Sequence, residues 1–227
     1  MKYFPRPLRI IAAAALAVAS LPAWAMAPFT ANYQASYMGM QANGVMTLAA
    51  EGDNRWRYSL QIKNAMADLS QSTVFEEHAG KLRPLTSHDR SVLLVKRKRV
   101  DARYDWNNNQ ASWTGDVKED RRGPIRLQNG DMDALLINLA IARDLQAGNP
   151  LNYRMVDDGR IKSMTYRVIG KENVTVGGRS QEATKVSRVD GDKEQIAWIV
   201  PGMPVPARLL QREKGQDALD LTIRSIN

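Results

Sequence analysis

Apolar and polar residues alternate with a period of two along most of this chain. In residues 55–63 every second position is apolar and the positions between them are polar or charged, and the same alternation recurs in residues 99–106. The apolar positions are Trp56, Tyr58, Leu60 and Ile62 in the first segment and Val100, Ala102, Tyr104 and Trp106 in the second. This pattern predicts strands with one buried face and one face in water.

Short polar turns separate such segments at the spacing that antiparallel hairpins need. Their Gly, Asn and Asp residues tolerate the positive φ angles of tight turns. The turns are Gly52–Asn54, Asn107–Asn109, Asp157–Gly159, Gly177–Gly178, Asp190–Asp192 and Lys214–Gln216. We expect about eleven strands. Because no repeat or Pro/Ser-rich linker divides the chain, residues 26–227 are predicted to form a single β-rich domain.

Residues 131–146 have helical periodicity instead. Asp131 and Asp133 fall in the predicted first turn, where the helix dipole favours carboxylates, and Gly148–Pro150 end the helix. Two apolar stripes run along it, one with Met132, Leu135, Leu136, Leu139 and Ala142, the other with Ala134, Ile137, Ile141 and Leu145. A surface helix has a single stripe, so this helix is expected to be covered on two sides.

The predicted fold is therefore mainly β. A large curved antiparallel sheet, forming a half-barrel or open barrel, is expected to hold the one central helix on its concave face. The sequence leaves open whether more chain, a ligand or a partner covers the second side of the helix.

The first 25 residues resemble a secretory signal. Lys2, Arg6 and Arg9 precede an apolar run, and Ala23–Ala25 provides the small residues that a signal peptidase needs, so cleavage is predicted after Ala25. No later apolar run is long enough to span a bilayer, so no transmembrane segment is expected in the mature chain. These features predict a periplasmic protein.

The composition narrows the possible functions. The chain has no cysteine, which excludes disulfides, thiol catalysis and a lipid-modified cysteine. Its formal net charge of +8 is a weak argument for anionic partners such as lipid head groups or glycans. Nucleic acid is not an expected partner in the periplasm.

Several segments resemble an uncharacterised family of exported bacterial proteins, domain of unknown function 3108 (DUF3108). They are Ser72–Phe75, Gly80–Pro84, Tyr104–Trp106, Gly130–Leu136, Val176–Arg179, Ala183–Val186, Trp198–Ile199 and Met203–Arg208. The resemblance covers essentially the whole mature chain and implies no activity, since none is established for the family. The strand-rich layout with an inserted helix also looks like the periplasmic lipoprotein carriers LolA and LolB, in which a curved sheet holds acyl chains beneath helices. Those carriers have several lid helices where one is predicted here, and LolB is lipid-anchored.

No catalytic or metal site can be identified from the residues. His78 and His88 are the only histidines, and no Gly-x-Ser-x-Gly motif surrounds a serine. Glu76 and His78 could point the same way on a strand, but two ligands do not make a zinc site. No pair of carboxylates stands out for glycoside hydrolysis. We therefore expect a protein that is not an enzyme and has no cofactor.

Two sets of residues are candidates for binding. A basic cluster could contact lipid phosphate, lipopolysaccharide or an acidic protein surface, or it could be the wet face of a strand that resists aggregation. It contains Lys96, Arg97, Lys98, Arg99 and Arg103. A large apolar set could line a cavity, or could fill the core. Its candidate cavity-lining members are Trp56, Tyr58, Tyr104, Trp106, Met132, Leu135, Leu136, Leu139 and Trp198.

Two hypotheses follow. In the first, the concave face of the sheet binds a lipid or another hydrophobic ligand beside the helix, and the protein serves envelope biogenesis or homeostasis. In the second, the helix fills the core completely and the protein is an envelope scaffold that docks another protein. We prefer the first.

Overall fold

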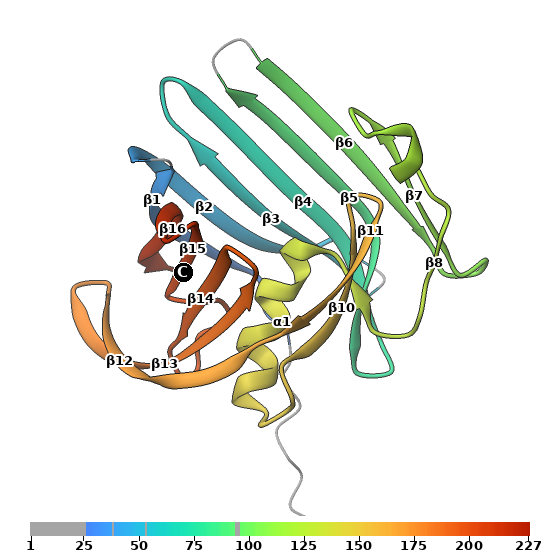
Figure 1. Ribbon diagram of the computed structural model, residues 1–227. Helices are drawn as coiled ribbons and strands as arrows, with labels where there is room; N and C mark the ends of the chain where they lie inside the picture. Colours follow the sequence, from blue (N-terminus) through green and yellow to red (C-terminus); the bar gives the residue numbers. More distant parts are fainter. Residues whose placement is uncertain (1–25, 38, 53, 94–95) are drawn as a thin grey trace, which may run out of the picture.

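A large curved sheet wraps around one helix in the computed structural model, which describes residues 26–37, 39–52, 54–93 and 96–227. Thirteen strands form this sheet and three more form a small one (Figure 1). The predicted signal segment, residues 1–25, lies outside the described residues. Among those described, no helix has both the length and the apolar character needed to cross a membrane.

The strands of the large sheet are, in spatial order, β12 (Arg167–Val176), β13 (Arg179–Asp190), β14 (Lys193–Ile199), β15 (Arg208–Glu213), β16 (Gln216–Ile226), β1 (Phe29–Tyr37), β2 (Met40–Ala50), β3 (Arg55–Lys63), β4 (Ala67–His78), β5 (Lys81–Leu93), β6 (Lys96–Asp105), β7 (Gln110–Gly115) and β8 (Ile125–Arg126). The small sheet contains β11 (Arg160–Thr165), β10 (Asn152–Asp157) and β9 (Asp131–Met132). The helices are α1 (Ala134–Gln146) and the short 3-10 helix η1 (Glu119–Arg121).

The last strand of the chain pairs with the first, and this pairing joins the two halves of the large sheet. Tyr33 on β1 lies opposite Ile223 on β16. The outermost strands β12 and β8 do not pair with each other, so the sheet is not closed into a barrel within the described residues. The predicted open, curved antiparallel sheet with one helix is confirmed. The strand count exceeds the expected eleven partly because β8 and β9 have two residues each, too few to show a sequence pattern.

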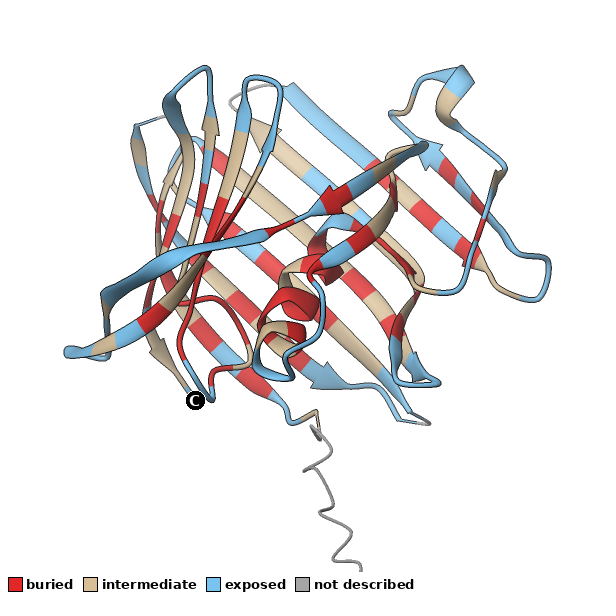
Figure 2. Cartoon of the chain, turned by 60° about the horizontal axis from the view of Figure 1, so that its bottom comes forward, coloured by how far each residue is buried: buried red, intermediate tan, exposed pale blue. Residues whose placement is uncertain are grey.

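Alternation in the sequence becomes alternation of burial in the sheet. On β3, Tyr58, Leu60 and Ile62 are buried, whereas Gln61 and Lys63 are exposed. The same banding crosses the neighbouring strands, where buried and exposed residues follow one another (Figure 2). The face that carries the buried residues is the one that meets the helix.

Helix α1 is buried on both of its apolar stripes. Leu136 from the first stripe and Ile141 from the second are both fully buried. The helix contacts β3, β4 and β5 of the large sheet and β10 of the small one, and it lies in the hollow of the curved sheet (Figure 1). The prediction that two sides of the helix are covered is confirmed. The large sheet covers one side, and β10 of the small sheet covers the other.

The predicted start of the helix at residue 131 is wrong by three residues. Asp133 is the N-cap, and its side chain accepts a hydrogen bond from the Leu136 N–H. Asp131 instead lies in β9, which pairs in parallel with β10. At the other end, the Gln146 side-chain amide donates to the Met203 carbonyl and accepts from the Gly202 N–H, which fixes the helix to the loop before β15.

Candidate binding cleft

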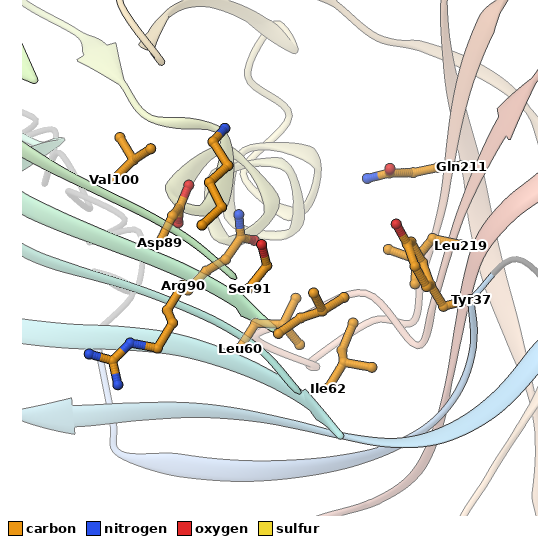
Figure 3. Close-up of a pocket in the computed structure, with 12 residues that line it drawn as sticks. Tyr37, Leu60, Ile62, Asp89, Arg90, Ser91, Val100, Gln211 and Leu219 are labelled. Carbon is orange, nitrogen blue, oxygen red and sulfur yellow. The ribbon is translucent and has the colours of Figure 1, made fainter. Parts of the chain in front are cut away.

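A cleft lies on the concave side of the large sheet, between the strands β3 to β6 and the strands β1, β15 and β16. Its main pocket has a volume of about 300 Å³. Strands β3 to β6 form one wall and β1, β15 and β16 form the other, as Figure 3 shows for the side chains that face each other across it. The lining residues are Tyr37, Leu60, Ile62, Leu69, Gln71, Asp89, Arg90, Ser91, Lys98, Val100, Gln211 and Leu219.

Two further pockets extend this cleft along the helix. One has a volume of about 300 Å³ and the other about 60 Å³. Both share Gln71 and Gln211 with the main pocket, and both reach Asn138 on α1. Asn138 and the exposed Ala134 belong to the part of the helix that the strands leave uncovered. The cleft therefore runs along a face of α1 that includes Asn138.

The main pocket has an apolar floor and polar groups around it. Leu60, Ile62 and Val100 are at most 7% exposed. Asp89 and Lys98 stand beside this floor. Burial, helped by repulsion from Asp157, raises the pKa of Asp89 to about 6, while a hydrogen bond from Gln71 and the Lys98 charge oppose the rise. Such an arrangement suits a ligand with an apolar chain and a polar head.

Two carboxylates hold the start of α1 next to the cleft. Asp133 accepts from Leu136 N–H at 2.7 Å and from the Thr73 hydroxyl at 2.6 Å. Asp157, at the end of β10, accepts from Ala134 N–H at 3.1 Å. Burial, and then repulsion from Asp157, raises the pKa of Asp133 to about 7. Burial also raises the pKa of Asp157. Together they satisfy backbone N–H groups that a helix leaves free in its first turn.

Replacing Asp133 with asparagine is expected to flatten the pH dependence of stability. A carboxyl whose pKa is raised by folding stabilises the folded state below its ordinary pKa, and this contribution is lost as pH rises through about 7. The wild type should therefore lose on the order of 2 kcal/mol relative to Asp133→Asn between pH 5 and pH 8. Asparagine keeps the cap because its oxygen also accepts from Leu136 N–H.

Urea unfolding of both proteins across this pH range measures the difference. Asp105→Asn is the control. Hydrogen bonds from Asn108 lower the pKa of Asp105, so its removal should change the pH dependence of stability only below the ordinary pKa of an aspartate, outside this range. If the difference in the free energy of unfolding between wild type and Asp133→Asn stays constant from pH 5 to pH 8, the raised pKa of Asp133 is contradicted.

The structure distributes the predicted cavity-lining residues among several environments. Of these residues, Leu135 lines the cleft along the helix. Tyr58, Tyr104, Leu136, Leu139 and Trp198 are buried in the packed cores, and Trp56 and Trp106 pack partly buried against them.

Polar partners explain where three of these aromatic residues lie. The Tyr104 hydroxyl donates to the Val156 carbonyl at 2.9 Å, and the Trp106 indole N–H donates to the Pro84 carbonyl at 2.6 Å. Trp198 lies between Lys185 and Arg208, at 4.9 Å and 4.7 Å from its ring, and its N–H donates to Glu172. The polar groups of these three side chains therefore have partners within the protein itself.

Met132 lines a different hollow, which has a volume of about 380 Å³ and lies near the C-terminal half of α1. Four of its charged groups form two ion pairs, Arg154 with Asp131 and Arg143 with Asp144, and Lys81 lines it as well. This hollow is polar and separate from the cleft.

Sequence reasoning missed most of the residues that line the cleft. Leu60 and Ile62 continue the same alternating face as Trp56 and Tyr58, so a signal for them was present. Leu219 and Gln211 carried no such signal, because their place opposite Leu60 depends on the pairing of β16 with β1.

The basic cluster lies on β6, where its members are exposed. Arg99 forms an ion pair with Asp101 at 2.8 Å, and Arg103 approaches Asp105 at 4.0 Å. His88 contacts the same Asp101 at 2.6 Å, on the face of the sheet opposite the cleft. In the described part of the chain, no group of three or more histidine or acidic side chains could hold a metal ion.

Comparison with known proteins supports the fold. The model of the family described as "Protein of unknown function (DUF3108)" matches residues 32–222. No curated protein matches the sequence. The crystal structure of a beta-barrel-like protein of domain of unknown function DUF1849 from Brucella abortus is similar, with a TM-score of 0.51 and 13% identity over 88% of this chain and 97% of that chain.

Two structures of MucB are less similar. The complex of Pseudomonas aeruginosa MucA and MucB has a TM-score of 0.40 and 11% identity, over 88% of this chain and 51% of that one. A crystal structure of MucB has a TM-score of 0.38 and 13% identity, over 88% and 52%. At these identities the comparisons concern the fold alone.

Proposed function

The chain belongs to the DUF3108 family of proteins of unknown function, and we propose that it is a non-catalytic binding protein that holds a lipid-like ligand in the cleft beside α1. The ligand would lay an apolar chain between the floor formed by Leu60, Ile62 and Val100 and the facing side chain of Leu219, with its polar head near Asp89 and Lys98.

The apolar floor between two walls of the sheet is the observation that supports this proposal. A ligand there would be screened from water by both walls of the cleft. Each CH₂ group that it buries would contribute roughly 0.8 kcal/mol to the free energy of binding. The main pocket alone is at the lower end of the range of roughly 300–1,000 Å³ found for small-molecule sites, and the adjoining pockets extend it. Gln71 and Gln211 offer hydrogen bonds along its length.

The residues around the cleft also favour a binding role over catalysis. Among the described residues, the His88–Asp101 pair lies on the other face of the sheet from the cleft, and none of the residues that line the main pocket is a histidine. We place the protein in the periplasm because residues 1–25 have the features of a secretory signal. Its role there would be in envelope biogenesis or homeostasis.

Mass spectrometry of the protein extracted from the periplasm without detergent tests the proposal. We expect a reproducible bound molecule with an alkyl chain, and saturable binding of a fluorescent fatty-acid probe to the emptied protein. A protein that is always empty and does not bind the probe would contradict a lipid-binding function.

Exposed apolar side chains near the β12 edge favour a second candidate, a scaffold that docks another protein. Val168 and Ile169 on β12 and Val189 on β13 are 58%, 53% and 68% exposed. β12 is the outermost strand of the sheet, and strand edges can pair with an extended segment of a partner. A periplasmic partner captured by the wild type and lost from Val168→Asp, with unchanged probe binding, would favour this candidate.

A further inference from the structure

Positive charge is concentrated at the outer end of the β5–β6 hairpin. Arg90 lies directly opposite Arg99 across the two strands, and Val92 and Leu93 lie opposite Arg97 and Lys96. Like charges in directly opposite positions destabilise a sheet unless a counter-charge is present. We call Arg90, Lys96, Arg97, Lys98 and Arg99 the basic end.

Carboxylates lie beside the convex side of the basic end, where Asp68, Asp89 and Asp101 line the same hollow as Arg90 and Arg99, but the cations at its tip are not paired with them. Within the described residues, Arg90, Lys96 and Arg97 form no ion pair, and Arg99 shares Asp101 with His88. Lys98 lies near Asp89, and its charge opposes the rise in the pKa of that carboxyl. The surface is therefore electrostatically complementary to an anionic partner.

The cations occur on both faces of the hairpin. Lys98 lines the cleft on the concave face, and Lys96 shares that face by alternation. Arg90 and Arg99 line a hollow on the convex face, and Figure 3 shows the Arg90 side chain directed away from the cleft. A partner seated on one face would meet only two or three of these five charges. A partner that meets the hairpin end-on would meet all of them.

Apolar side chains accompany the charges at the same end of the sheet. Met66, in the adjoining β3–β4 turn, is 48% exposed. The turn is ordered by the Asn64 side chain, which accepts from the Met66 and Ala67 N–H groups and donates to the Gln41 carbonyl. Ala67 pairs with the partly buried Leu93, so this turn and the hairpin end are neighbours.

We propose that this end of the sheet docks on a membrane surface rich in anionic phospholipids. Exposed cations interleaved with apolar side chains are the features that bind such surfaces. Ile62, Leu69, Ser91 and Lys98 from the same strand ends line the cleft, so docking would place the cleft against the lipid from which a ligand could enter. The docking stands on the charge pattern, whereas the entry of a ligand rests on the proposed function.

Co-sedimentation with vesicles tests the docking. The protein should bind vesicles of phosphatidylcholine mixed with phosphatidylglycerol, and should not bind phosphatidylcholine alone. Because charges at a surface are screened by salt, binding should weaken at high ionic strength. The double variant Lys96→Gln/Arg97→Gln should bind about tenfold or more weakly.

The matched control is Arg55→Gln/Arg179→Gln, which removes two exposed cations from the opposite end of the sheet. It should retain wild-type vesicle binding. Equal binding of wild type to neutral and anionic vesicles, no binding to either, or equal losses in both double variants would overturn the proposal. Aggregation of Lys96→Gln/Arg97→Gln without vesicle binding by the wild type would instead assign these cations to protection of the strand end.

Binding of the fluorescent fatty-acid probe without vesicles separates the two proposals. Lys96→Gln/Arg97→Gln should keep its affinity for the dissolved probe while losing the vesicles. Vesicle binding by a protein that never binds the probe would leave the docking intact and contradict the cleft function.

Discussion

Leu136→Ala is expected to lower the free energy of unfolding by about 3–5 kcal/mol. Leu136 is fully buried on α1, within the core cluster that unites the strands of both halves of the sheet. Truncation would leave a cavity where the helix meets its surroundings, and the sheet on one side and β10 on the other limit how far the site can collapse. Urea unfolding followed by circular dichroism measures the loss.

Leu145→Ala on the same helix is the control for this prediction. Leu145 is only partly buried, so its truncation should cost about 1 kcal/mol. Equal losses from the two variants would mean that α1 is not packed on both sides, and the description of the helix as the centre of the fold would be incorrect.

Leu219→Trp is expected to weaken binding of the fatty-acid probe by at least about tenfold, which corresponds to roughly 1.4 kcal/mol. Leu219 is half-buried on β16 and lines both the main pocket and the smallest adjoining one, so an indole at this position would occupy the space that a ligand needs. The side chain projects into an existing hollow, and little loss of stability is expected. Probe fluorescence and urea unfolding measure the two effects.

Val189→Trp adds the same side chain on an exposed position of β13, outside the cleft. It should leave probe affinity unchanged. Loss of binding in Val189→Trp but not in Leu219→Trp would move the site from the cleft to the exposed position of Val189 on β13.

The architecture could be predicted because it depends on local patterns. The alternation in residues 55–63 identified the buried face of β3, and the two apolar stripes of α1 showed that the helix is enclosed. The start of the helix was misplaced because Asp131 and Asp133 look alike in sequence. Only the fold shows that Asp133 caps the helix, whereas Asp131 pairs with Arg154.

The cleft could not be predicted to the same extent. Its two walls come from strands far apart in the chain, and the pairing of β16 with β1 brings Leu219 opposite Leu60. Aromatic residues drew attention because of their size, but Trp198 has its own polar and cationic partners and Tyr104 has the Val156 carbonyl. Size and alternation identify burial. They do not distinguish a packed side chain from one that borders a hollow.

The most direct test of the binding cleft is a methyl NMR titration of the intact protein with the fatty-acid probe. Saturable shift changes at the methyl groups of Leu60, Ile62 and Leu219, with smaller changes elsewhere, are the predicted result, because these side chains line the main pocket. Changes confined to Val168, Ile169 and Val189, or no changes at saturating probe, would contradict the account.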